Sequence, residues 1–133
     1  PAAIRPWQHV LEPLYGYLML AQSLYVDGQK HAEAWNFGPA DADAKSVEWI
    51  TQTMLAHWGG DARYEVQQQH GALHEAHLLK LDCTKARTLL GWQPSWTLEA
   101  SIKRICDWQK AFLQGQDMHQ YCLQEIAHYS RIP

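Results

Sequence analysis

Apolar positions recur with helical spacing in the first part of the chain, from residue 11 to residue 25. Because positions three and four residues apart lie on one face of a helix, they form a single apolar stripe. Its members are Leu11, Leu14, Leu18, Ala21 and Tyr25. Glu12-Pro13 places a proline in the first turn, where a helix tolerates it, and Asp27-Gly28 is a typical helix end. We predict a helix here, with this stripe as its core face.

Four further helical patterns follow. The first three each come after a side chain that can cap a helix, Ser46, Asp82 and Thr97, and the last begins at Asp117. The first pattern ends at Gly59-Gly60, the second covers 83–90, the third is longer, and the last extends to about residue 129. The core face predicted for the first is Val47, Ile50, Met54 and Trp58. The core face predicted for the third is Leu98, Ile102, Ile105, Phe112 and Leu113.

Strand patterns are few and short. Pro6 biases its neighbours away from helix, so we expect 7–10 to be extended. Residues 34–37 have the pattern of a buried strand that runs into a turn, and 63–67 alternate weakly, as a half-buried strand does. Residues 68–77 are polar and rich in histidine, which indicates a loop. The predicted fold class is therefore α+β, mostly helical, with little sheet.

Length and composition fit one ordinary domain. The 133 residues are 47% hydrophobic and 19% charged, which excludes a disordered chain. Because the net charge is −3 and Lys and Arg are scattered, we expect neither nucleic acid nor a membrane as a partner. No apolar run approaches the length of a bilayer span. Cys83, Cys106 and Cys122 form no Cys-x-x-Cys pair, so we expect reduced thiols in a cytoplasmic protein.

Several standard catalytic motifs do not occur in the sequence. It contains no Gly-x-Gly-x-x-Gly fingerprint for a dinucleotide, no phosphate loop that ends in Gly-Lys-Ser/Thr and no Gly-x-Ser-x-Gly elbow. None of the six tyrosines is followed four residues later by the lysine that would lower its pKa for use as a base. We therefore predict no catalytic and no cofactor-binding residue in these 133 residues.

Four motifs remain, at 5–14, 34–39, 74–86 and 90–94. Arg5 can present a planar guanidinium to a phosphate, although a solvated arginine beside a core tryptophan explains the first motif as well. The polar segment with His74 and Glu75 suits either ligand contact or an ordinary solvated loop. The last motif has the residues of a helix end followed by a packed tryptophan.

Together these motifs resemble the C-terminal part of the extended short-chain dehydrogenases/reductases that act on sugar nucleotides. In that family an Arg-x-Trp/Tyr-x-x-Val segment, an Asn-x-Gly turn and a terminal Leu-Gly-Trp-x-Pro occur in this order, as they do at 5–10, 36–38 and 90–94. Within the family, Pro6, Glu12-Pro13 and the run 74–76 are similar to the branch of CDP-glucose 4,6-dehydratases.

The resemblance implies an NAD-dependent lyase that converts CDP-glucose into CDP-4-keto-6-deoxyglucose, an early step toward the dideoxyhexoses of bacterial surface polysaccharide such as lipopolysaccharide O-antigen. NAD and the catalytic groups would belong to an N-terminal Rossmann half of the same protein. Residues 1–133 would then be the substrate-binding domain of a longer chain, without the Rossmann domain and inactive alone. Members of the family are commonly homo-oligomers.

The resemblance also implies a set of substrate contacts. Arg5 matches the arginine that contacts the diphosphate in relatives. The segment with His74 and Glu75 occupies the place where many relatives have a second phosphate-binding arginine. Trp7, Gln8 and His9 are further candidates for the pocket lining, and Trp7 is equally suited to the core.

Three other interpretations remain open at this point. The chain could serve a different sugar-nucleotide dehydratase or epimerase. It could be a stand-alone, non-catalytic ligand-binding domain. The third is a small metal-binding module on His70, His74 and His77, whose spacings could suit zinc although no cysteine lies near them in sequence; we predict no metal site.

Overall fold

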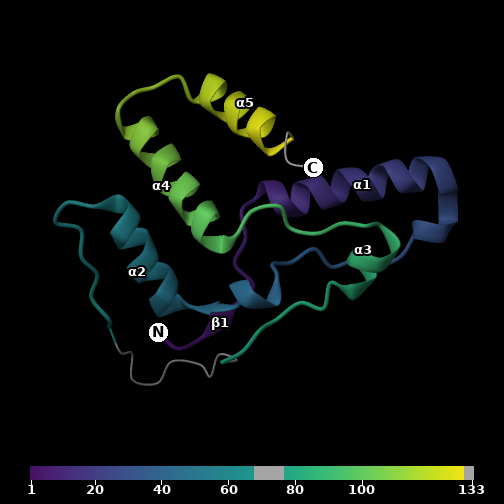
Figure 1. The fold of residues 1–133 in the computed structure, drawn as a ribbon, viewed down its shortest axis with the longest axis horizontal. Helices are drawn as coiled ribbons and strands as arrows, with labels where there is room; N and C mark the ends of the chain where they lie inside the picture. Colours follow the sequence, from purple (N-terminus) through teal and green to yellow (C-terminus); the bar gives the residue numbers. More distant parts are fainter. Residues whose placement is uncertain (68–76, 131–133) are drawn as a thin grey trace.

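The computed structural model describes residues 1–67 and 77–130 of the chain. The described part is mostly helical, as predicted, and has one two-stranded sheet (Figure 1). Its elements are β1 (Ile4–Arg5), α1 (Leu11–Asp27), η1 (Gly28–His31), η2 (Asp41–Asp43), β2 (Lys45–Ser46), α2 (Val47–Trp58), α3 (Thr84–Leu89), α4 (Leu98–Leu113) and α5 (Met118–Tyr129). Helices α2, α4 and α5 gather at one end, whereas α1 extends toward the other end, where α3 lies (Figure 1).

Hydrogen bonds confirm the caps predicted at Ser46 and Thr97, whereas the cap residue of α3 is Cys83 and not the predicted Asp82. Ser46 Oγ accepts from the backbone N–H of the third helical residue at 3.2 Å, and Thr97 Oγ1 does the same at 3.3 Å. Asp117 Oδ1 accepts from two backbone N–H groups, at 3.0 and 3.2 Å. Asp82 Oδ1 accepts from the N–H of Thr84 at 2.9 Å, which starts α3 one residue later than predicted. These local bonds satisfy N–H groups that the helix itself leaves unpaired.

The predicted strands are wrong in position. The sheet pairs β1 with β2 in antiparallel orientation, whereas 7–10, 34–37 and 63–67 contain no strand. Residues 34–37 instead offer their carbonyls to side chains: Gln8 Nε2 donates to Phe37 O at 2.8 Å, and Lys85 Nζ to Ala34 O at 3.1 Å. Phe37 is buried as expected and Trp35 is half-buried, but Ala34 and Asn36 are exposed, so the predicted burial holds for only part of this segment and the predicted pairing is wrong. Residues 63–67 are exposed.

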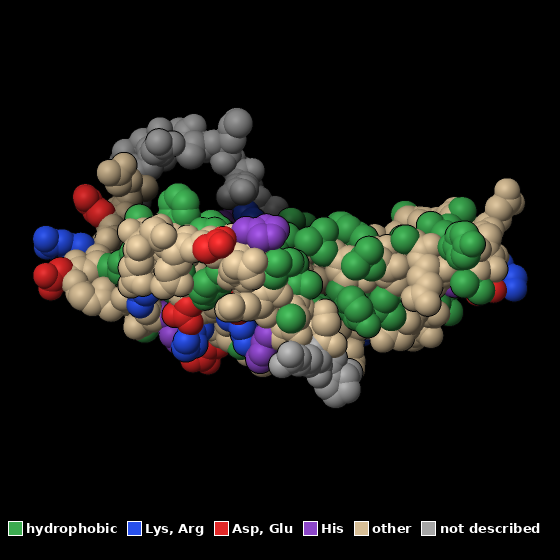
Figure 2. All heavy atoms as spheres, turned by 90° about the horizontal axis from the view of Figure 1, so that it is seen from above, with side chains coloured by type: hydrophobic (Ala, Val, Ile, Leu, Met, Phe, Trp, Pro, Cys, Tyr) green, Lys and Arg blue, Asp and Glu red, His purple; other side chains and the backbone are tan. Residues whose placement is uncertain are grey.

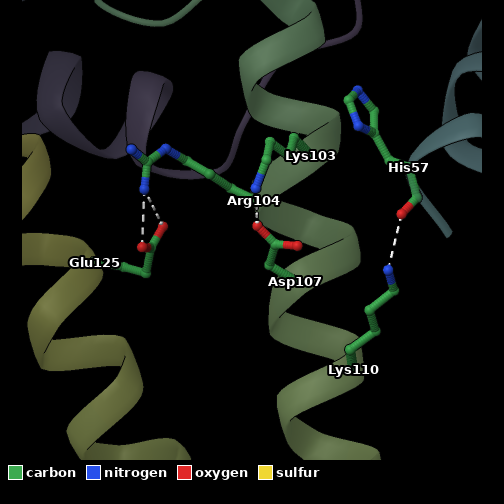
Figure 3. Close-up of polar contacts among 6 residues, drawn as sticks. All are labelled: His57, Lys103, Arg104, Asp107, Lys110 and Glu125. Atoms are coloured by element: carbon green, nitrogen blue, oxygen red, sulfur yellow. Dashed lines mark hydrogen bonds and ion pairs between the residues drawn. The ribbon is translucent and has the colours of Figure 1, made fainter.

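Two apolar clusters form the core. The first consists of Phe37, Cys83, Ala86 and Trp92, and the second of Ile50, Leu98, Ile102 and Cys106. Trp92 is only 1% exposed, which confirms the structural role predicted for the motif at 90–94. Lys110 Nζ of α4 donates to the backbone oxygen of His57 in α2 at 2.8 Å (Figure 3). This bond links the two helices that carry the residues of the second cluster.

The apolar faces predicted for α1 and α4 are only partly buried. Leu14, Leu18 and Tyr25 of α1 are exposed, Leu18 to 69% and Tyr25 to 93%. The residues that α1 buries fully are Glu12 and Gly16, and Met19 and Leu20 pack half-buried against the first cluster. In α4, Leu98 and Ile102 are buried, whereas Ile105, Phe112 and Leu113 are exposed. Figure 2 shows the resulting gathering of hydrophobic side chains over the half of the molecule that carries α1.

The three cysteines are free thiols. Cys83 and Cys106 are buried and Cys122 is exposed. Burial raises the pKa of the Cys83 and Cys106 thiols, which therefore stay protonated and pack as small apolar side chains. In the described part of the chain, no helix combines the length and apolar content needed to cross a bilayer.

Candidate substrate-binding site

Arg5 lies at the end of β1, between two neighbouring segments. On one side it pairs with Lys45 of β2. On the other side, Ile4 N donates to His77 O at 2.8 Å and Leu79 N donates to Ile4 O at 3.1 Å. Arg5 itself is half-buried, and its Nη1 donates to Ile4 O at 2.9 Å. The fold therefore holds the predicted phosphate-binding arginine on a strand that is hydrogen-bonded on both edges.

His74 and Glu75 lie outside the described residues, as does His70. The chain enters the description again at His77, whose carbonyl accepts the Ile4 bond. The residues from His77 onward therefore lie beside the strand that carries Arg5. The order of the motifs could not show this contact, because 71 residues lie between Arg5 and His77 along the chain (77 minus 5, less 1).

Trp7 and Gln8 line a small cavity of about 150 Å³ beside the second core cluster. Trp7 is half-buried and packs against the second core cluster. Gln8 uses its Nε2 to bind Phe37 O, so it connects the segment after β1 to the Asn-x-Gly turn. Both contacts are those of residues that position a neighbouring strand, and for Trp7 they favour the core role that the sequence left open.

His9 lines a groove between the start of α1 and helices α4 and α5, and its ring is held in one tautomer. Its Nδ1 accepts a hydrogen bond from the backbone N–H of Leu11 at 3.2 Å, so the neutral ring carries its proton on Nε2. The ring packs edge-on against Trp96, with 4.9 Å between ring centroids. Burial lowers the pKa of His9, and the carboxylates of Glu125 and Glu12 oppose that shift without cancelling it. The structure therefore favours the neutral imidazole.

The groove has a volume of about 360 Å³ and lies where the start of α1 meets α4 and α5. Arg104 of α4 reaches across to Glu125 of α5 and binds both carboxylate oxygens, at 2.9 and 3.0 Å (Figure 3). Its guanidinium also lies 4.2 Å from the centroid of the Trp96 ring. The lining is otherwise mainly apolar and consists of His9, Val10, Leu11, Arg104, Ile105, Trp108, Cys122, Glu125 and Ile126. No motif pointed to Arg104 and Glu125, because they meet only when α4 and α5 pack.

Titration of His9 predicts a pH dependence of stability. Because the folded state lowers its pKa, the contribution is fully present above the unfolded value of 6.5 and is lost as pH falls from there toward the lowered value. We expect His9→Asn to flatten this part of the profile, since an amide oxygen can still accept from Leu11 N and does not titrate. Urea unfolding between pH 5 and 8, roughly the window in which histidine charges, measures it. His119→Asn, at an exposed position, is the control; equal slopes for His9→Asn and the wild type contradict the prediction.

Comparison with known proteins identifies one clear relative. The chain is 51% identical to a CDP-glucose 4,6-dehydratase of Salmonella typhimurium. The similarity extends over 129 residues, which are 97% of this chain and 36% of the relative. The predicted resemblance to CDP-glucose 4,6-dehydratases is therefore confirmed, and the chain spans about a third of the length of this relative. No protein-family model matches the chain.

Proposed function

We propose that this chain is the substrate-binding portion of an NAD-dependent CDP-glucose 4,6-dehydratase that forms CDP-4-keto-6-deoxyglucose. The observation that carries the proposal is 51% identity to such a dehydratase over nearly the whole chain. The alignment includes the segment that holds Arg5, because only four residues of the chain fall outside it (133 minus 129). The fold is compatible with it, since the strand that carries Arg5 is hydrogen-bonded to β2 on one edge and to His77 and Leu79 on the other.

In this proposal, substrate binding and NAD-dependent chemistry belong to two different parts of one enzyme. The 133 residues contain no glycine fingerprint for NAD and no tyrosine–lysine pair for proton transfer. We therefore assign NAD, which would take a hydride from the hexose and return it, to the N-terminal Rossmann half of the protein. This chain would bind and orient the sugar nucleotide, and would be inactive alone. Fixing the hexose relative to the nicotinamide is a substantial part of catalysis.

Helix α1 supports a partner of this kind. Its 17 residues include only two charged side chains, Glu12 and Asp27, and Glu12 is buried. A helix that is apolar on nearly all sides is normally covered on all sides, yet Leu18 and Tyr25 are exposed in this chain. We propose that the Rossmann half of the same protein covers this surface. A homo-oligomer of the complete enzyme in the cytoplasm is part of the same proposal and rests on the resemblance.

Arg5 provides the direct test of substrate binding. In the complete enzyme, Arg5→Ala is expected to weaken binding of CDP-glucose by roughly 10- to 100-fold, the usual loss for one charge-assisted contact. Arg5→Lys keeps the charge but not the fork and should recover only part of the affinity. Isothermal titration calorimetry measures both, and Arg63→Ala, which removes an exposed arginine, is the matched control. If the Arg5→Ala enzyme binds CDP-glucose as tightly as the wild type does, Arg5 is not a substrate-binding residue.

The nucleotide specificity needs a separate experiment. We expect CDP-glucose to bind the complete enzyme more tightly than dTDP-glucose or UDP-glucose do. Equal or stronger binding of either competitor would favour a different sugar-nucleotide dehydratase or epimerase.

The coding sequence upstream of Pro1 tests whether the NAD-binding and catalytic residues belong to an N-terminal part of the same protein. A dinucleotide fingerprint and a Tyr-x-x-x-Lys in frame support this assignment, and an in-frame stop codon contradicts it.

A further inference from the structure

Three segments that are distant in the sequence form a closed ring of contacts next to Arg5. They are 4–8, which begins with β1, the Asn-x-Gly turn at 36–38, and 77–83. Ile4 joins the first segment to the third, because it donates to one backbone carbonyl of that segment and accepts from one of its backbone N–H groups. The Asn-x-Gly turn contacts each of the other two segments and so closes the ring.

The Asn-x-Gly turn packs closely on the segment 77–83. Asn36 Nδ2 donates to the backbone oxygen of Asp82 at 3.2 Å. A Cβ on Gly38 would lie 3.2 Å from Sγ of Cys83, which is tighter than an ordinary van der Waals contact, so the glycine permits this close approach. Because Cys83 is buried in the first core cluster, the turn lies against a fixed part of the domain.

Gln8 joins the first segment to the Asn-x-Gly turn. Its Nε2 donates to Phe37 O at 2.8 Å. Phe37 is buried and packs edge-on against Trp92, with 5.1 Å between ring centroids, so the acceptor has a fixed position. The Oε1 atom of Gln8 is buried as well, and it has no hydrogen-bond partner among the described residues. The amide group is therefore used or covered within the domain.

The backbone between Arg5 and Gln8 is short and constrained. Pro6 has a fixed φ, and Trp7 N donates to Arg5 O at 2.9 Å. Strand β1 is only two residues long, so contacts beyond the sheet contribute to where its end lies. A displacement of Gln8 is therefore passed on to Arg5, because the link between them has little freedom to absorb it.

We propose that Gln8 is a positioning residue of the substrate-binding site, which fixes Arg5 through the hydrogen bond to Phe37 O. The proposal rests on the proposed function, because it takes Arg5 to be the residue that binds the diphosphate. The sequence suggested Gln8 for the pocket lining, whereas the bond to Phe37 O makes its role indirect. Since a guanidinium contact with a phosphate depends on the orientation of its planar fork, a displaced Arg5 binds the ligand less tightly.

A double-mutant cycle in the complete enzyme tests whether Gln8 acts through Arg5. Gln8→Met keeps the length of the side chain but removes the donor, and should weaken binding of CDP-glucose about fivefold, the usual effect of one neutral hydrogen bond. In the Arg5→Ala background the same change should alter binding by less than about twofold, because the group that Gln8 positions is gone. Isothermal titration calorimetry measures the four proteins. Gln8→Ala is a second variant if methionine disturbs the packing, and Gln52→Met, at an exposed position of α2, is the matched control.

The outcomes separate this proposal from the proposed function. If the wild type does not bind CDP-glucose, the proposed function itself fails. If Arg5→Ala binds weakly while Gln8→Met and Gln8→Ala bind as tightly as the wild type, the positioning role is wrong and the function stands. Equal weakening by the Gln8 change with and without Arg5 also overturns the role, because Gln8 then acts independently, and so does wild-type affinity of Arg5→Ala. Weakening that disappears in the Arg5→Ala background supports the role.

Discussion

Replacing Glu12 with alanine is expected to destabilise the protein by about 4 kcal/mol, because it leaves several buried donors without a partner. Glu12 is 1% exposed. Its carboxylate accepts from Ser95 N at 2.9 Å, from Trp96 N at 2.8 Å and from Tyr129 Oη at 2.8 Å. One side chain therefore connects α1, the segment before α4 and the end of α5.

Two milder changes at the same place give a graded series. Tyr129→Phe removes one of the three bonds and should cost about 1 kcal/mol. Burial, with the Glu12 carboxylate adding to it, raises the pKa of the Tyr129 phenol, so the hydroxyl remains a donor at any working pH. Glu12→Gln keeps the shape but turns an amide N–H₂ toward a donor, and should fall between the other two.

Urea unfolding followed by tryptophan fluorescence measures this series as shifts of the midpoint at constant slope. Trp92 Nε1 donates to the backbone oxygen of Glu12 at 3.2 Å, a bond that all three variants keep, so the start of α1 remains anchored. Glu99→Ala, at an exposed position in the first turn of α4, is the control and should stay within about 0.5 kcal/mol. The prediction is wrong if Glu12→Ala is no less stable than Tyr129→Phe.

Gly16→Ala should destabilise the protein by about 2 kcal/mol, although alanine is a better helix former than glycine by about 1 kcal/mol. A Cβ at residue 16 would lie 2.3 Å from Cδ1 of Phe37. Phe37 has little room to move, because it is buried and packs edge-on against Trp92 with 5.1 Å between ring centroids. Helix α1 must therefore shift away from the first core cluster or the cluster must open.

The double variant Gly16→Ala with Phe37→Leu tests this cause. If the clash with the ring is responsible, the smaller leucine relieves it and the double variant is more stable than the sum of the two single effects predicts. Gln22→Ala introduces alanine at an exposed position of the same helix and should be neutral or slightly stabilising. Additive losses, or a Gly16→Ala protein as stable as the wild type, would contradict the close approach of α1 to Phe37.

Local structure was predictable because its causes are local. Ser46, Thr97 and Asp117 cap their helices through bonds to residues two or three positions away, and a sequence pattern contains both partners. The same holds for Gly91, whose φ of +68° follows the end of α3 and turns the chain into Trp92. Arg5 could be chosen as a candidate for the same reason, because the motif that contains it lies within the ten consecutive residues 5–14.

Pairings across long stretches of chain were not predictable. In the sequence, Glu12 was only a helix-opening residue and a mark of one branch of the family, yet its three partners lie 83, 84 and 117 residues away. The Arg104–Glu125 pair and the Arg5–Lys45 register depend in the same way on how elements pack. The sequence predicted a buried strand at 34–37, but only Phe37 is buried and the segment contains no strand, because the pattern carries no information on whether a neighbouring strand exists.

The sequence by itself therefore determined the helices, most of their caps and the likeness to CDP-glucose 4,6-dehydratases. Only the tertiary structure decided which apolar faces are covered, where the sheet lies, and that the Glu12 carboxylate is buried against three donors. The physical reason is the distance along the chain between the residues that interact. A cap or a turn is satisfied within a few residues, whereas a buried carboxylate, a strand register or a groove depends on distant segments that the packed chain brings together.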